Sequence, residues 1–103
     1  MKKHKISIKP IAAEDMQACI DYVCDNLNNS TAALRLLDKI EHMYDLLEDN
    51  PFMGKEHITE GGHTYRYVLI KSYMIFYKVQ DNSVVICRFL YGASDYDNQL
   101  ENT

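Results

Sequence analysis

Apolar and polar residues alternate with two different periods along this chain, and each change of period marks a new element. Residues 5–9 alternate one by one, which is the pattern of a half-buried β-strand. Pro10 ends this strand, because proline has no N–H to donate to a sheet ladder. From Glu14 to Leu27 apolar residues recur every three or four positions, so this segment is predicted to be an amphipathic helix.

A second and longer helix is expected from Ser30 or Thr31 to Asp49. Either hydroxyl can cap the first turn by accepting a bond from a free backbone N–H. The apolar stripe of this helix consists of Ala33, Leu36, Leu37, Ile40, Met43, Tyr44 and Leu47. Pro51 ends the helix, since the residue before a proline disfavours helical backbone. Only Asn28 and Asn29 separate the two helices, which should therefore form an antiparallel hairpin.

Three strands are predicted in the last part of the chain. Residues Tyr65–Ile70, Tyr73–Gln80 and Ser83–Tyr91 are rich in β-branched and aromatic side chains. The connections between them, Lys71-Ser72 and Asp81-Asn82, have two residues each, so the strands should form an antiparallel meander. Residues 51–63 contain a proline and three glycines and are interpreted as a surface loop.

The order strand, helix, helix, three strands predicts one α+β domain of two layers over residues 1–103. The helical hairpin should cover one face of a four-stranded sheet. The run Val84-Val85-Ile86-Cys87 is apolar on both faces, which places the last strand in the sheet interior. The opposite sheet face is expected to have no helix of its own and to stay available to another molecule.

Charge is distributed unevenly along the chain, whose net charge is −4. Residues 14–60 carry eleven acids and three bases, whereas residues 64–91 carry four bases and one acid. A local basic face is compatible with this pattern, although the whole chain attracts phosphate only weakly. No run approaches the ~20 apolar residues of a membrane span. The basic N-terminus is not followed by the apolar run of a signal peptide, so a cytoplasmic location is expected.

Neither the cysteines nor the histidines have the spacing of a metal site. The cysteines, Cys19, Cys24 and Cys87, are odd in number and lack paired spacing, which indicates free thiols. The histidines are dispersed along the sequence, and His57 and His63 are expected to be solvated in the loop. No metal and no cofactor is predicted.

Taken in order, several segments resemble the RelE/ParE superfamily of toxins. They are the hairpin end Asn50-Pro51-Phe52-Met53-Gly54, the arginine in Tyr65-Arg66-Tyr67, the run 73–79, and the closing run 84–92. The similarity extends from Ile6 to Leu100. It implies the toxin of a type II toxin–antitoxin system, of the kind known from plasmid stabilisation. It also implies a cognate antitoxin that wraps the toxin and hides its apolar and basic surface.

The resemblance leaves the mode of action open. RelE-like members are ribosome-dependent endoribonucleases that cut messenger RNA, whereas ParE-like members bind DNA gyrase and poison it. The expected target is therefore either the ribosome with its messenger or gyrase, with no membrane involved, and enzyme activity is undecided. A third possibility is a domain that binds its partner but has lost toxicity. Self-association into a homodimer also stays open.

Cutting RNA through its own 2′-hydroxyl needs a base, positive charge at the phosphorane and a proton donor. Arg66 and Arg88 match arginines that relatives carry on the first and last meander strands, and either could clamp an oxyanion. Tyr91 stands where relatives often have histidine; it could donate a proton, but a phenol is a poor base at neutral pH. These three are the candidate catalytic residues, expected to converge at one end of the sheet.

Lys71, Tyr73 and Tyr77 are candidate contacts to nucleic acid or to a protein partner, because tyrosines stack on bases and lysines bind phosphate. Arg88 is expected on the face of Val84 and Ile86, where a structural ion pair is the competing interpretation. Relatives often have arginines after the last strand, but here Gly92-Ala93-Ser94-Asp95 follows. The missing charge weakens the ribonuclease hypothesis more than the gyrase hypothesis.

Overall fold

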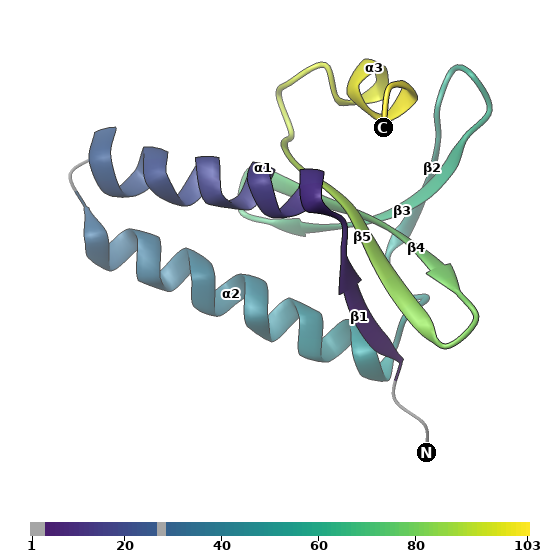
Figure 1. Ribbon diagram of the computed structural model, residues 1–103, viewed down its shortest axis with the longest axis horizontal. Helices are drawn as coiled ribbons and strands as arrows, with labels where there is room; N and C mark the ends of the chain where they lie inside the picture. Colours follow the sequence, from purple (N-terminus) through teal and green to yellow (C-terminus); the bar gives the residue numbers. More distant parts are fainter. Residues whose placement is uncertain (1–3, 27–28) are drawn as a thin grey trace.

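The computed structural model describes residues 4–26 and 29–103 (Figure 1). Its elements are β1 (Lys5–Ile8), α1 (Pro10–Asp21), the π-helical segment η1 (Tyr22–Asn26), α2 (Ser30–Asp49), β2 (Lys55–Ile58), β3 (Thr64–Ile70), β4 (Tyr73–Gln80), β5 (Ser83–Tyr91) and α3 (Tyr96–Glu101). The α+β class and the antiparallel meander are therefore confirmed. The predicted end of the first helix at Leu27 and the break at Asn28 lie outside the described residues.

The first helix begins earlier than predicted, at Pro10. Proline suits the first helical position because its missing N–H has no partner there and its φ is already helical. After Asp21 the helix widens into η1, a geometry that is rare and often found at functional sites. The cap of α2 is Asn29, whose side chain accepts a bond from the N–H of Ala32 at 3.0 Å. Ser30 is thus the first residue inside the helix.

The sheet has five strands in the order β1-β5-β4-β3-β2. The strand β1 pairs parallel to β5, and the other pairs are antiparallel. The prediction that the last strand lies in the sheet interior is confirmed. The prediction of a surface loop over residues 51–63 is wrong at Lys55–Ile58, which pairs with Thr64–Tyr67 of β3. The sequence Lys-Glu-His-Ile lacks apolar alternation, because this strand lies at the sheet edge.

The two long helices run side by side over one face of the sheet (Figure 1). Their apolar stripes and this face form one core, in which the fully or nearly fully buried members are Ala12, Leu36, Ile40, Leu47, Val68, Ile70, Ile75, Tyr77, Val84, Ile86 and Phe89. Met16 of α1 accepts a hydrogen bond from the hydroxyl of Tyr44 on α2 at 2.9 Å, which ties the hairpin together. Burial raises the pKa of Tyr44 to about 12.

The opposite sheet face is not bare, and this is a correction to the sequence-based expectation. The C-terminal helix α3 lies against it (Figure 1) and buries Leu100 almost completely. A second apolar cluster results, made of Tyr65, Met74, Phe76, Cys87, Leu90 and Leu100, with Tyr67, Val85 and Tyr96 beside it. Six helical residues preceded by a short polar segment gave no periodic signal of this element.

Two histidine–carboxylate contacts hold α3 to the β2–β3 hairpin. His57 Nε2 lies 2.7 Å from Asp97 Oδ1, and His63 Nε2 lies 3.8 Å from Glu101 Oε2. The loop between the strands adds backbone donors, with the N–H of Glu60 bonded to Asp97 and that of Gly61 to Glu101. The expectation of a solvated His57 is therefore wrong, because its ring also contacts aromatic neighbours at the edge of the second cluster.

Candidate functional site

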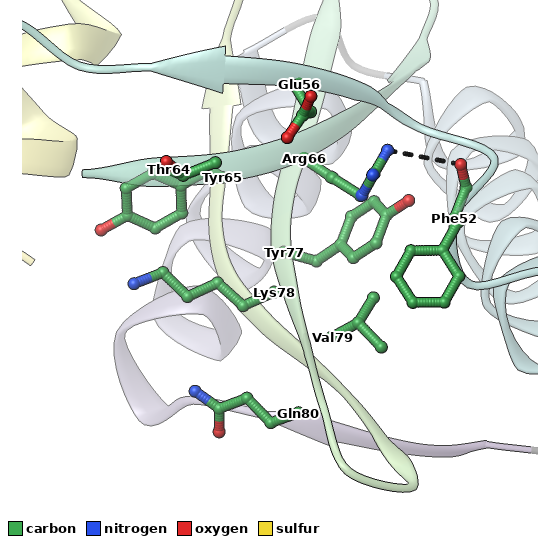
Figure 2. A pocket seen from close by; sticks show the side chains of 9 residues that line it. All are labelled: Phe52, Glu56, Thr64, Tyr65, Arg66, Tyr77, Lys78, Val79 and Gln80. Carbon is green, nitrogen blue, oxygen red and sulfur yellow. Dashed lines mark hydrogen bonds between the residues drawn. The ribbon is translucent and has the colours of Figure 1, made fainter. Parts of the chain in front are cut away.

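Arg66 lies in a notch where the start of β3 diverges from the end of β4 (Figure 2). The notch encloses about 250 Å³. The Nη1 of Arg66 donates to the carbonyl of Gly54 at 2.8 Å and, more weakly, to that of Phe52 at 3.4 Å. The guanidinium also lies over the ring of Phe52, 5.2 Å from its centroid. Arg66 therefore fixes the segment between α2 and β2 while keeping part of its charge accessible.

The second cation of the notch, Lys78, points to the other side of the sheet. Arg66 is paired with Tyr77 of β4, so it shares the helix-covered face of that residue. Lys78 is the next residue along β4 and faces the opposite way. Its Nζ lies over the ring of Tyr65 at 4.6 Å, on the left in Figure 2, while Arg66 points right. The two charges thus do not converge on one anion.

Arg88 is held in an internal ion pair and only 9% of the residue is exposed. Its Nε and Nη2 donate to the two carboxylate oxygens of Asp15 at 2.7 and 3.0 Å. Asp15 also accepts from the N–H of Phe89 at 3.1 Å. Since β1 pairs with β5 only as far as Ile86, this carboxylate caps the part of β5 beyond it. The competing interpretation of a structural ion pair thus describes Arg88.

The face assigned to Arg88 from the sequence is wrong. The strands β4 and β5 are out of register at one point, where Phe76 pairs with Arg88 but Tyr77 pairs with Ile86. This bulge inserts an extra residue, so Arg88 moves to the face of Phe76, away from that of Ile86. Strict alternation along the strand could not anticipate the shift, because a bulge leaves no mark in the apolar pattern of this run.

The expected convergence of Arg66, Arg88 and Tyr91 does not occur. Arg66 pairs with Tyr77 and Tyr91 pairs with Tyr73, which lies four residues away from Tyr77 along β4. Four strand residues span roughly 13 Å. Tyr91 therefore stands at the far end of the sheet from the Arg66 notch, and Arg88 lies between them on the other face.

Tyr73 and Tyr91 form an aromatic pair on the helix-covered face, just beyond the helical core. Their ring centroids are 5.7 Å apart in an edge-to-face arrangement, and Tyr73 stacks on Phe89 at 5.3 Å. A hydrogen bond with Cys19, reinforced by burial, raises the pKa of Tyr73 to about 12. Tyr73 is therefore a neutral phenol at physiological pH, and 51% of Tyr91 is exposed beside it.

Of the remaining candidates, Tyr77 is internal and Lys71 is on the surface. Tyr77 is fully buried, and its hydroxyl donates to the carbonyl of Pro51 at 2.8 Å and accepts from the N–H of Gly54 at 2.9 Å. A partner in contact with the surface does not reach it. Lys71 is exposed in the β3–β4 turn, where its φ of 53° places it in the left-handed region.

An apolar groove that the sequence did not indicate runs between α2 and β3. Two adjoining hollows of about 380 and 290 Å³ share Met43 and Leu69. Exposed apolar side chains border it, with Leu69 60% and Met53 40% exposed. The charged side chains that line it are Asp38, Lys39, Lys55 and Lys71, which gives a basic balance. We call this surface the α2–β3 groove.

Beyond Tyr67, the edge of β3 that faces away from β4 has no strand partner among the described residues, and this edge borders the α2–β3 groove. The strand β2 ends its pairing at Tyr67, whereas β3 continues to Ile70. The carbonyl of Tyr67 points to the β2 side, where it would lie 2.7 Å from a Cβ placed on Gly54. Groups two residues apart on a strand point the same way, so those of Leu69 face the groove. The groove thus offers both apolar surface and an open strand edge.

Comparison with known proteins assigns the family. A model described as "ParE toxin of type II toxin-antitoxin system, parDE" matches residues 6–96. The chain belongs to the ParE toxin family. A solved structure titled "Chromosomal ParDE TA system from P. aeruginosa" shares the fold of this ParE-family chain, with a TM-score of 0.68 at 16% identity. The match covers 86% of this chain and 96% of that one. None of the curated proteins matches the sequence significantly.

The chain belongs to the family although its second sheet face is not bare. In this ParE-family toxin α3 occupies much of it, and the α2–β3 groove is the open surface instead. Over residues 4–26 and 29–103 no group of side chains has the composition and proximity of a metal site. No helix in the same ranges is long and apolar enough to cross a bilayer.

Proposed function

We propose that this ParE-family toxin inhibits growth by binding DNA gyrase rather than by cutting messenger RNA. The observation that carries the proposal is the separation of the three candidate catalytic residues. Arg88 is bound to Asp15, and Arg66 and Tyr91 stand at opposite ends of the sheet. RNA cleavage needs its acid, base and cation within hydrogen-bond reach of one phosphate. These positions favour a binding surface over a reaction centre.

The charge distribution supports the same proposal. Residues 89–103 contain no lysine, arginine or histidine, and the net charge of residues 1–103 is −4. A toxin that holds messenger RNA in a ribosome gains affinity from phosphate contacts and the counterions they release. A toxin that acts on a protein target has no such requirement. The acidic balance is therefore compatible with gyrase and unfavourable for RNA.

We further propose that a cognate antitoxin occupies the α2–β3 groove in an extended conformation. An added strand can bond to the open edge at Leu69, which gives affinity through backbone hydrogen bonds. Apolar side chains of the same segment would contact Met43 and Met53. Acidic residues beside them would pair with Lys39 and Lys71 at the rim. Arg88 needs no cover from the antitoxin, because Asp15 already supplies it.

Inducible expression of the lone chain tests the mode of action in cells. Plasmid superhelicity and incorporation of labelled amino acids should be followed in parallel during the first minutes after induction. The proposal predicts loss of negative supercoiling before protein synthesis declines, because gyrase would be the first process blocked. Co-expression of the antitoxin should abolish both effects.

Messenger cleavage and loss of toxicity would each give a distinct result in the same experiment. Rapid arrest of translation with new messenger cleavage at the ribosomal A site, and unchanged superhelicity, would establish an RNA-cutting toxin. Normal growth at full expression would establish a domain that binds its partner without poisoning the cell. Either result overturns the gyrase proposal.

A further inference from the structure

A cup of three tyrosines lies where η1 meets the start of β4 and the end of β5. Tyr22, Tyr73 and Tyr91 line a hollow of about 410 Å³, separate from the Arg66 notch and from the α2–β3 groove. Tyr22 and Tyr91 are each about half exposed, at 53% and 51%. Tyr73 forms the inner wall and is fixed by stacking on Phe89. We call this hollow the tyrosine cup.

The rings of the tyrosine cup are held by independent elements, so the hollow is built into the fold. Tyr22 opens the π-helical turn that follows α1, and Tyr73 begins β4. Tyr91 ends β5 and meets Tyr73 edge to face at 5.7 Å. In an edge-to-face pair, the ring that contributes its edge keeps both of its faces out of that contact, and the face of a phenol ring attracts positive charge.

The acidic sequence around Tyr22 favours a cation in the tyrosine cup and disfavours a phosphate. The segment from Pro10 to Asn26 contains no lysine, arginine or histidine, and its acids other than Asp15, which is paired with Arg88, are Glu14, Asp21 and Asp25. Asp21 and Asp25 flank Tyr22 in the sequence, one directly before it and one three residues after it. Lys71, in the β3–β4 turn, lines a different hollow that shares only Tyr91 with the cup. Nucleic acid would meet repulsion from these carboxylates.

We propose that the tyrosine cup binds an arginine side chain presented by a protein partner. A guanidinium is planar, weakly hydrated and able to stack on aromatic faces, which suits it to a hollow of three phenol rings better than an ammonium group. Its N–H groups can also donate to the phenol oxygens at the rim. The site is distinct from the α2–β3 groove, and the proposal does not depend on which protein the toxin inhibits.

NMR titration of the whole chain with N-acetyl-arginine amide tests the proposal. N-acetyl-citrulline amide is the control probe, because it has nearly the same shape without the charge. The ring signals of Tyr22, Tyr73 and Tyr91 should shift saturably with the arginine probe, and the citrulline probe should bind about fivefold or more weakly. Equal binding of both probes, or no saturable shift of these rings, overturns the proposal.

Two substitutions at Tyr22, an exposed position, distinguish loss of the aromatic ring from a general effect on folding. Tyr22→Phe keeps the π-face and should retain arginine binding, whereas Tyr22→Leu should weaken it about threefold or more. Phe52→Leu, an exposed aromatic outside the cup, is the matched control and should bind as the wild type does. Unchanged affinity of Tyr22→Leu contradicts the proposal. Tighter binding of uridine monophosphate than of the arginine probe would assign the cup to nucleic acid and also overturn it.

Discussion

At the scale of single residues, several polar side chains of this protein form hydrogen bonds with backbone groups that lie outside the strand pairing. Asp15 lies on α1 but accepts hydrogen bonds from Arg88 and from the backbone of Phe89 on β5. Tyr77 similarly joins β4 to the chain segment around Gly54. Arg66 bonds to two carbonyls of the same segment. These side chains replace hydrogen bonds that the neighbouring strands do not supply.

Breaking the Asp15–Arg88 pair from one side should be costly. Arg88→Met leaves a mostly buried carboxylate unpaired and is expected to lower the free energy of unfolding by about 3 kcal/mol. The double variant Asp15→Asn with Arg88→Met should recover part of this loss, with a coupling free energy of about 2 kcal/mol. Urea denaturation of the wild type, both single variants and the double variant gives the four free energies of unfolding from which the coupling free energy is calculated. Additive effects of the two substitutions would show that the pair contributes no mutual stabilisation.

Removing one hydroxyl at Tyr77 should also destabilise the fold. Tyr77→Phe leaves the carbonyl of Pro51 and the N–H of Gly54 buried without their partner, which should cost about 1–3 kcal/mol. Tyr67→Phe is the matched control, and its stability should stay within about 0.5 kcal/mol of the wild type. Chemical denaturation compares the two variants. Equal stability of both would contradict the structural role assigned to Tyr77.

At the scale of elements, the helices and strands with a clear residue pattern could be predicted from the sequence. The elements that depend on contacts with other parts of the chain could not. The strands β4 and β5 match the predicted ranges residue for residue, because both are dense in β-branched and aromatic residues and are joined by a two-residue turn. The strand β2 and the helix α3 were not predicted. β2 exists through its pairing with β3, and α3 through its contacts with the β2–β3 hairpin. Such elements are stabilised by tertiary contacts, which a local pattern does not contain.

Docking of α3 should depend on pH through Asp97. Hydrogen bonds from the backbone of Glu60 and from His57 lower the pKa of Asp97 from its ordinary value of 3.8. A lowered folded-state pKa gives stability that is present above 3.8 and lost as pH falls through the folded-state value. The stability difference between wild type and Asp97→Asn should therefore be constant near neutrality and shrink below pH 3.8.

The control for this pH dependence lies on the same helix. Asp95 makes no side-chain cap bond at the start of α3, so Asp95→Asn should follow the wild-type pH profile of unfolding. Urea denaturation between neutral pH and about pH 3 measures all three proteins. A difference between wild type and Asp97→Asn that does not change with pH would show that the carboxylate charge does not hold α3 in place.

At the scale of the whole molecule, the surfaces open to partners are not the ones that the sequence indicated. The family and the α+β fold followed from the order of short segments along the chain. The candidate site did not, because a bulge turned Arg88 inward and α3 covered the second sheet face. The α2–β3 groove arises where β2 stops short of the end of β3. The groove exists because β2 is shorter than β3, and the relative length of two strands cannot be predicted from any single residue.

A substitution in the α2–β3 groove should abolish antitoxin binding without unfolding the toxin. Leu69→Glu places a negative charge on an exposed apolar position that faces the proposed acidic partner. The affinity for the antitoxin should fall about tenfold or more, while stability changes by about 0.5 kcal/mol or less. Ile58→Glu is the matched control, because Ile58 is 64% exposed on β2 and lies outside the groove. Calorimetric titration measures both, and equal affinities would contradict the proposed location.

The most direct test of the central claim is inhibition of purified DNA gyrase by the purified toxin in the absence of ribosomes. We expect the wild type to block supercoiling of relaxed plasmid. The double variant Asp15→Asn with Arg88→Met, once shown to be folded, should block it too, because Arg88 acts inside the fold. Full supercoiling in a large excess of folded wild-type toxin would contradict gyrase inhibition.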